Sequence, residues 1–222
     1  MIQLTKSGLA CECDLNTLMH QFSEQHTARL RQLLHPDLIQ MILEDLECGA
    51  WMPRDHGAIG RELLLDGVRA VGVLRFVVNT PEFLKTVERI TQCGSISVFD
   101  GRIYRMAPGT DHYDSWHDDT NDNRLVGMSV NLGSLPYLGG VFQLRKNSCE
   151  EILCEVPNVV QGDAILFRIS PELKHRITPV QGTQPKTAFA GWFRSAAPDF
   201  FSELVHSAAH QYSCTALQST DS

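Results

Sequence analysis

The segment from residue 162 to residue 194 reads GDAILFRISPELKHRITPVQGTQPKTAFAGWFR. It contains three short stretches rich in apolar and β-branched residues, at 164–168, 175–180 and 186–194, with turn-forming residues between them. Runs of this length, bounded by turns, predict strands rather than helices.

The same pattern extends back to residue 95. Turn residues such as Asp100-Gly101, Asn121-Asp122-Asn123 and Gly139-Gly140 separate further short segments. The additional candidate strands are 95–99, 102–107, 126–132, 141–145 and 152–157. Together, eight short strands behind a helical lead predict a closed or double-sheet barrel with helices on one outer face.

The N-terminal part has the spacing of helices. Asp14 can cap a first helix, Pro36 is suited to begin a second, and Asn79 to Glu82 have capping-box spacing for a third. Residues 50–66 are polar and glycine-containing, which predicts a loop. The apolar faces of the three helices are Leu15, Leu18, Met19 and Phe22; Leu38, Ile39, Ile42, Leu43 and Leu46; and Phe83, Leu84, Val87 and Ile90.

We therefore expect one structural domain with three parts. Residues 1–94 form a helical lead that packs on the barrel, and residues 95–198 form the barrel itself. Residues 199–222 form a C-terminal helix, at about 199–210, and a flexible polar tail.

Composition and charge argue against several classes of function. The formal charge of −7 over 222 residues, without a basic cluster, argues against a nucleic-acid partner. No apolar stretch is long enough to span a membrane and the N-terminus lacks the order of a signal peptide, so we expect a cytoplasmic protein. Seven scattered cysteines, with only the Cys11-x-Cys13 pair close together, are typical of free thiols rather than of a zinc site.

A candidate metal site lies in the strand-rich half. His117 and Asp119 form a His-x-Asp pair, and His175 follows 58 residues after His117. On an extended segment the side chains of His117 and Asp119 share one face. Two imidazoles and one carboxylate leave coordination positions open, as ferrous oxygenases require for a cosubstrate and dioxygen. A second copy of the pair, His112-Tyr113-Asp114, is a local rival.

A lone cation, Lys186, lies eleven residues after His175. It shares a strand face with Ala188 and Ala190, whose small side chains leave room for a small diacid such as 2-oxoglutarate. The ammonium group of Lys186 could pair with the distal carboxylate of that diacid inside the barrel. The opposite face carries Phe189 and Phe193, which suit packing under the helices.

The stretch from about Tyr104 to Phe193 resembles the catalytic domain of the prolyl 4-hydroxylase-like branch of the 2-oxoglutarate/Fe(II) oxygenases. The matching pieces, in order, are Gly109 ahead of His117-x-Asp119, the strand 128–132, Gly139-Gly140-Val141-Phe142, Gly162-Asp163 with Leu166-Phe167, His175-x-Ile177-x-Pro179-Val180, and Lys186 followed by Trp192-Phe193. The resemblance implies a mainly β fold with a helical N-terminal part (α+β). Its core would be a double-stranded β-helix (jelly-roll, cupin-like) flanked by α-helices.

The resemblance also implies an activity. The expected cofactors are Fe(II), 2-oxoglutarate as cosubstrate and dioxygen, with ascorbate as a candidate stimulant. The expected reaction is hydroxylation of an unactivated C–H bond in a peptide or protein residue of prolyl type, or in an amino-acid-like small molecule, with release of succinate. Two other classes stay open: a metal-binding cupin-like protein that does not use 2-oxoglutarate, and a non-catalytic barrel that acts as a binding module.

Two details bear on the site. In the family a glycine lies several residues before the metal histidine, and Gly109 is eight residues before His117 but only three before His112. This spacing favours His117 and Asp119 over His112 and Asp114. The family's tyrosine directly after an arginine is replaced here by Met106, and Tyr104 is a candidate substitute toward 2-oxoglutarate.

Further side chains are candidates for substrate contact. Arg194 could hold an anionic group, Trp192 is either a core residue or a substrate platform, and Gln143 follows the Gly-Gly turn. Asp118 is expected to support the site by hydrogen bonding rather than to bind metal. The sequence does not identify the substrate, which resemblance of fold cannot decide.

Overall fold

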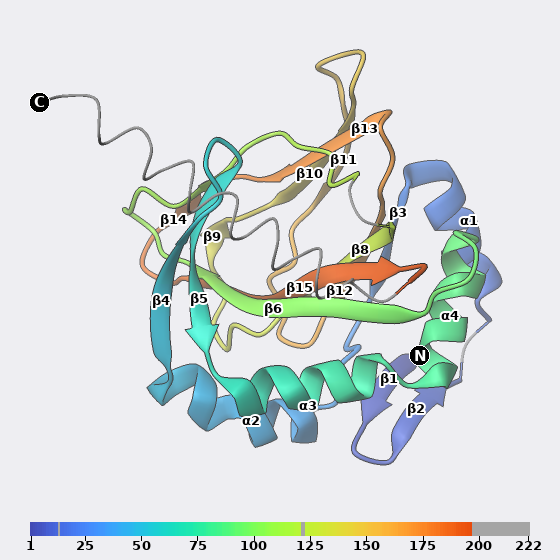
Figure 1. The fold of residues 1–222 in the computed structure, drawn as a ribbon, viewed down its shortest axis with the longest axis horizontal. Helices are drawn as coiled ribbons and strands as arrows, with labels where there is room; N and C mark the ends of the chain where they lie inside the picture. The colour runs from blue at the N-terminus through green and yellow to red at the C-terminus, as the bar shows by residue number, and fades with distance from the viewer. Residues whose placement is uncertain (13, 121–122, 197–222) are drawn as a thin grey trace, which may run out of the picture.

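A large curled antiparallel sheet forms the centre of the protein. The computed structural model describes residues 1–12, 14–120 and 123–196 (Figure 1). The strand order of the large sheet is β3-β12-β8-β15-β6-β5-β4, and β7 also pairs with β5. These strands are β3 (Thr27–Leu30), β12 (Ala164–Arg168), β8 (Arg124–Asn131), β15 (Lys186–Arg194), β6 (Val98–Met106), β5 (Gly60–Asp66), β4 (Ala50–Asp55) and β7 (Tyr113–Asp114).

A smaller sheet completes the barrel. Its order is β11-β10-β13, formed by β11 (Ile152–Val156), β10 (Phe142–Lys146) and β13 (Leu173–Ile177), and all its pairs are antiparallel. Two further short pairs form two-stranded sheets: β9 (Leu138–Gly139) with β14 (Val180–Gln181), and β1 (Ile2–Thr5) with β2 (Gly8–Cys11). The predicted fold class, a mainly β chain with a double-stranded β-helix core flanked by helices, is confirmed.

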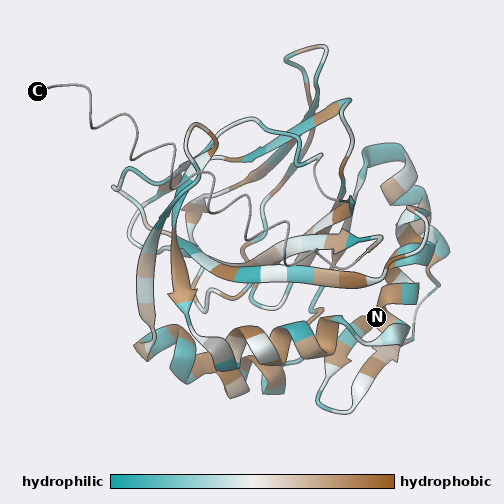
Figure 2. Ribbon diagram, viewed as in Figure 1, coloured by the Kyte–Doolittle hydropathy of each residue, from teal (hydrophilic) through white to brown (hydrophobic). Residues whose placement is uncertain are grey.

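The helices lie on the side of the large sheet that is away from the small sheet (Figure 1). They are α1 (Asn16–Gln25), α2 (Pro36–Cys48), α3 (Val68–Val78) and α4 (Pro81–Thr91). Apolar and polar residues alternate around α2 and α3 (Figure 2), as expected for helices with one face in a core. None of the helices in the described ranges is long and apolar enough to cross a membrane.

The large sheet has a core on each face. Between sheet and helices, the tilted rings of Phe99 and Phe193 have centroids 4.7 Å apart, and the ring centroid of Phe83 in α4 lies 6.2 Å from that of Phe193. Between the two sheets, a second cluster joins Tyr104 and Met106 to residues of the small sheet. The prediction that Phe189 and Phe193 pack under the helices is confirmed.

The N-terminal part contains five strands, and the prediction of a purely helical lead is wrong in this respect. β3 has only four residues, too few to show a periodicity, and it takes its place in the large sheet by pairing with β12. The predicted loop at 50–66 is a hairpin in which β4 pairs with β5 from Ala50↔Asp66 to Asp55↔Arg61. Its polar side chains, which suggested a loop, belong to the edge of the sheet and to the candidate site.

Helix α2 begins at Pro36 as predicted, but two caps differ. Helix α1 begins at Asn16, one residue after the position that Asp14 would cap, although the Asp14 carboxylate accepts a hydrogen bond from the Asn16 amide at 3.0 Å. Asn79 does not cap α4. Its side-chain oxygen instead accepts a hydrogen bond from the Phe99 amide at 2.7 Å, and its side-chain nitrogen donates to the Phe99 carbonyl at 3.0 Å. These two hydrogen bonds join the end of α3 to β6.

The predicted turn at Asp100-Gly101 is wrong, because β6 runs through it. Gly101 pairs with Gly191 of β15, and a Cβ atom on Gly191 would lie 2.0 Å from the Asp100 carbonyl oxygen. The glycines therefore permit a close approach of two strands rather than a change of direction. The predicted C-terminal helix and tail, and most of the predicted turn at 121–123, lie outside the described residues.

We predict that Gly191→Ala destabilises the protein by about 1–3 kcal/mol or more, because the new methyl group meets backbone that cannot move aside. Gly72→Ala, in α3, is the matched control: a Cβ there meets nothing within 4 Å. It should raise stability by about 0.5–1 kcal/mol. Urea denaturation measures both, and equal effects of the two changes would contradict the close-approach explanation.

Candidate metal centre and its surroundings

A backbone bridge positions the two candidate imidazoles. The His117 amide donates to the His175 carbonyl at 3.1 Å, and the His175 amide donates to the His117 carbonyl at 2.9 Å. The bridge fixes the segment after β7 against β13, and the two imidazole centroids lie 4.3 Å apart. Two residues far apart in sequence thus present their rings side by side.

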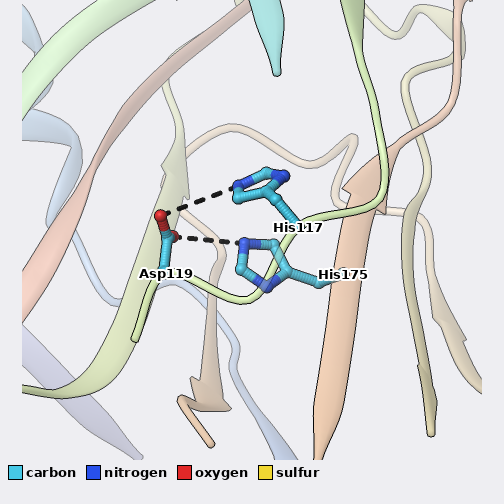
Figure 3. A group of neighbouring side chains, drawn as sticks. All are labelled: His117, Asp119 and His175. Atoms are coloured by element: carbon cyan, nitrogen blue, oxygen red, sulfur yellow. Dashed lines mark ion pairs between the residues drawn. The ribbon is translucent and has the colours of Figure 1, made fainter. Parts of the chain in front are cut away.

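Asp119 completes the cluster. Its Oδ2 lies 3.3 Å from His175 Nε2 and its Oδ1 lies 3.8 Å from His117 Nε2 (Figure 3). One ligand atom from each of the three residues lies within 4.8 Å of the others, and within the described ranges this is the only such group of three. The structure therefore brings His117, Asp119 and His175 together, as the sequence predicted.

The local geometry of the His-x-Asp pair differs from the prediction. Asp119 has a φ of 59°, in the left-handed region, so the pair is not extended as assumed from strand alternation. A non-glycine residue held there stores strain of about 1–3 kcal/mol, and such strain gathers at functional sites. A turn of the chain, not strand alternation, brings the Asp119 carboxylate to the imidazoles.

Neighbouring groups orient the three side chains. Trp192 Nε1 donates to Asp119 Oδ2 at 2.7 Å, and Arg124 donates to Oδ1 at 3.2 Å. Burial would raise the pKa of Asp119, but the hydrogen bond and charge of His175, the charge of His117 and the Trp192 bond hold that pKa well below its usual range. His117 Nδ1 lies 2.7 Å from the Ser115 carbonyl, which leaves Nε2 to act as a ligand.

The rival pair is not brought together as a ligand set. His112 Nδ1 accepts from the Ala107 amide at 3.0 Å and stays in the preceding turn. Asp114 does reach the site, but its Oδ2 accepts from the Ile177 amide at 2.6 Å and so secures β13. The geometry agrees with the choice that the glycine spacing favoured.

Lys186 is a buried cation whose hydrogen-bond partners carry no charge. Its side chain is 2% exposed, and Nζ donates to the Tyr137 hydroxyl at 2.8 Å and to the Gly140 carbonyl at 3.2 Å. No carboxylate of the described residues lies within ion-pair distance of it, and burial lowers its pKa from 10.5 to about 8, with Asp114 acting in the opposite direction. Gly140 allows the approach, because a Cβ atom there would lie 2.8 Å from the Tyr137 ring.

Comparison with known proteins identifies this part of the chain. Residues 101–194 match the sequence model of the 2OG-Fe(II) oxygenase superfamily. Residues 101–194 form a 2OG-Fe(II) oxygenase domain. A search of curated protein sequences gives no significant match.

Solved structures share the fold of the oxygenase domain. A Pseudomonas putida prolyl-4-hydroxylase has a TM-score of 0.60 and 16% identity, covering 83% of this chain and 100% of its own. A Trichoplax adhaerens prolyl hydroxylase, in complex with a peptide fragment of the hypoxia inducible factor oxygen degradation domain, gives 0.61 and 15%, covering 82% and 89%. The non-haem α-ketoglutarate-dependent epimerase SnoN from nogalamycin biosynthesis gives 0.61 and 12%, covering 82% and 81%. The predicted family, with its prolyl 4-hydroxylase-like fold, is confirmed.

A cavity of about 690 Å³ opens beside the metal cluster of the oxygenase domain. His117, Asp119 and His175 line it, as do the predicted candidates Tyr104, Trp192 and Arg194. Met106, which pairs with Lys186 across β6 and β15, lines it as well, although Lys186 itself does not. Tyr104 is buried, which raises the pKa of its phenol, and its hydroxyl has no hydrogen-bond partner among the described residues.

Three other predicted residues have defined partners. Trp192 is neither pure core nor a free platform, since it holds the carboxylate of Asp119. Arg194 is 3% exposed and lies 3.7 Å from Asp100. Gln143 does not line the cavity, because its side chain bonds Glu155 and accepts from Arg176 Nε at 2.7 Å.

Asp118 lines the cavity near the metal cluster, but its Oδ1 accepts hydrogen bonds from both the amide and the hydroxyl of Thr120.

The sequence did not predict a role near the site for two sets of residues. Tyr137, the partner of Lys186, has only the nearby Gly139-Gly140 turn as a signal. The second set is a chain of contacts in which Arg102 Nε donates to Glu62 Oε1 at 2.7 Å and His56 Nε2 lies 3.1 Å from the same oxygen. Glu62 lies in the segment interpreted as a loop, so its strand position was hidden.

Glu62 is 7% exposed, and its charge is balanced by its neighbours. Burial would raise its pKa, but the His56 hydrogen bond and the charge of Arg102 outweigh burial and lower the pKa from 4.5 to about 2. A lowered pKa means that ionised Glu62 stabilises the fold above pH 4.5 and that this contribution disappears as the pH falls toward 2.

We predict that Glu62→Gln lowers the unfolding free energy by about 3 kcal/mol at pH 7, because it leaves Arg102 without its buried counterion. The difference from the wild type should shrink between pH 4.5 and pH 2, as Glu62 itself becomes protonated. Denaturation of the metal-free protein across this pH range measures both values. Exposed Glu24→Gln is the control, and a pH-independent loss in Glu62→Gln would contradict the assignment.

Proposed function

We propose that this protein is a dioxygenase that uses Fe(II), 2-oxoglutarate and dioxygen to hydroxylate a C–H bond. The observation that carries the proposal is the cluster of His117, Asp119 and His175 inside a 2OG-Fe(II) oxygenase domain. When bound, iron with 2-oxoglutarate and dioxygen supplies the oxidising chemistry, and 2-oxoglutarate leaves as succinate and carbon dioxide.

The donor set fits ferrous iron. Two imidazole nitrogens and one carboxylate oxygen suit this metal and leave further coordination positions open. Hydrogen bonds within the protein orient these ligands. The Ser115 carbonyl lies next to Nδ1 of His117 and so leaves Nε2 free, and Trp192 and Arg124 orient the Asp119 carboxylate. The intact carboxylate supports hydroxylation, since the family resemblance links halogenation to a small residue at this position.

Lys186 fits the distal carboxylate of 2-oxoglutarate. It is a buried ammonium group with only neutral hydrogen-bond partners, and a buried charge of this kind is stabilised by an ion of opposite charge. We propose that Tyr137 assists Lys186, and that Tyr104, whose hydroxyl is unused by the described residues, contacts the same cosubstrate. 2-Oxoglutarate would lie between Lys186 and the metal cluster.

Apolar side chains limit water in the cavity. Phe142, Phe167 and Ile177 line it next to His175, whose ring lies 4.6 Å from the Phe167 ring. A dry site strengthens the electrostatic interactions of bound groups and protects a reactive centre from side reactions.

Two of the similar solved structures bear on the substrate class. The Trichoplax adhaerens neighbour has a peptide bound, and SnoN acts in nogalamycin biosynthesis. We propose a peptide residue of prolyl type or an amino-acid-like small molecule as the substrate.

Succinate formation tests the function as a whole. The purified protein, supplied with Fe(II), 2-oxoglutarate, ascorbate and a panel of peptides and amino acids, should form succinate and add one oxygen atom to a substrate. Succinate that never forms, despite bound iron, would favour the cupin-like or non-catalytic alternatives.

For the metal, we predict that His117→Ala and His175→Ala lower the affinity for Fe(II) by more than the roughly 10- to 100-fold that loss of an outer hydrogen-bond partner costs. His112→Ala, which changes the rival histidine in the preceding turn, should leave the affinity unchanged. Anaerobic titration with Fe(II) or Co(II) measures each affinity. A loss in His112→Ala equal to that in His117→Ala would reject this ligand set.

For the cosubstrate, we predict that Lys186→Met raises the stability of the ligand-free protein at pH 7 by about 1–4 kcal/mol, because it removes a buried charge. The same change should abolish the rise in melting temperature that 2-oxoglutarate causes in the wild type. The stability gap should be full below pH 8 and narrow as the pH rises through 10.5, above which the wild-type lysine is neutral in both states. A destabilised variant that still responds to 2-oxoglutarate would contradict the role of Lys186.

A further inference from the structure

Arg102 lies on the face of β6 that lines the cavity. It pairs with Ala190 of β15, and the next inward pair along the two strands is Tyr104 with Ala188. The small side chains of the two alanines leave space in front of the Arg102 guanidinium. The rings of Tyr104 and Trp192 lie 5.7 and 5.5 Å from its Cζ atom, so that aromatic faces flank the cation.

The Nε atom of the Arg102 guanidinium is bonded within the protein, and its two terminal nitrogens are available to a ligand. Its Nε donates to Glu62, which is buried and also contacted by His56. Among the residues that the structure describes, Glu62 is the only hydrogen-bond partner of Arg102, so its two terminal NH₂ groups remain for the cavity. A guanidinium fixed in this way presents one planar edge with two parallel donors.

Positive charge exceeds negative charge at this end of the cavity. Arg54 lines the same space as Arg102, and burial together with the charge of Arg102 lowers the pKa of Arg54. Of the carboxylates that the structure describes, only Glu62 forms an ion pair with Arg102, and Asp100 is bonded to Arg75 at 2.6 Å. An anion would therefore find uncompensated positive charge here.

This end of the cavity is separate from the proposed cosubstrate end. Lys186 pairs with Met106, and Arg102 lies four residues earlier on β6, about 13 Å away along an extended strand. Lys186 therefore lies at the Met106 end of the inward face and Arg102 near the middle of β6, with the pair Tyr104–Ala188 between them.

We propose that Arg102 binds a carboxylate of the substrate, so that this oxygenase acts on a small carboxylic acid of amino-acid size. The inference rests on the proposed function, which supplies the reaction at the neighbouring metal cluster. A carboxylate suits the site because it is planar and can accept two parallel hydrogen bonds from the one free edge of Arg102. The cavity volume of about 690 Å³ is within the usual range for small-molecule sites.

Thermal denaturation with the proteinogenic L-amino acids and their carboxamides as probes tests this inference. We expect at least one free acid to raise the melting temperature while its amide does not. Arg102→Gln should weaken binding of that acid by about 10- to 100-fold, as expected for loss of charge-assisted hydrogen bonds, and Arg102→Lys should weaken it less. Exposed Arg31→Gln is the matched control and should bind the acid like the wild type.

A comparison of two variants separates this inference from the proposed function. The response to the acid should be lost in Arg102→Gln and kept in Lys186→Met, whereas the response to 2-oxoglutarate should show the reverse. Loss of the 2-oxoglutarate response in the wild type would reject the proposed function but leave the carboxylate site standing. The carboxylate site is overturned if amides bind as well as acids, if no acid binds, or if Arg102→Gln binds the acid normally.

Discussion

The carboxylate of Asp119 lies where the two sheets of the barrel meet, and it is in contact with both. His175 reaches it from the small sheet, and Trp192 and Arg124 reach it from neighbouring strands of the large sheet. These contacts hold Asp119 in a left-handed backbone conformation that an isolated chain would rarely adopt. Because the same carboxylate belongs to the candidate metal site, the packing of the sheets and the geometry of the site depend on each other.

The inward face of the large sheet carries two cations. β6 and β15 run side by side, and their pairing places Lys186 opposite Met106 and Arg102 four residues away, near the middle of β6. The hydrogen-bond partners of Lys186 are neutral, whereas Arg102 is paired with a buried carboxylate. The charge of Lys186 is therefore uncompensated by its partners, and the charge of Arg102 is partly balanced by Glu62. Small residues on β15 keep the space between them open, and Phe189 and Phe193 of the same strand face the helices instead.

Prediction from the sequence succeeded where the signal is local. The second half of the chain alternates short apolar runs with turns, and most of the strands lie close to their predicted ranges. The hairpin of β4 and β5 was missed because it is an edge element with many charged residues, which resembles a loop when read alone. The turn predicted at Asp100-Gly101 failed for a related reason: a glycine permits a turn, but it also permits two strands to approach closely, and only the partner strand decides between them.

The sequence by itself determined the family, the three metal-binding candidates and the buried lysine, because residue type and order along the chain carry that information. The glycine spacing favoured one His-x-Asp pair, but only the tertiary structure decided that this pair meets His175, since both pairs have the same internal spacing and differ in the hydrogen bonds that hold them. It also decided that Tyr137 faces Lys186 and that Glu62 anchors Arg102. These contacts join residues 40 or more positions apart, and no local pattern records which distant side chains a folded sheet will place together.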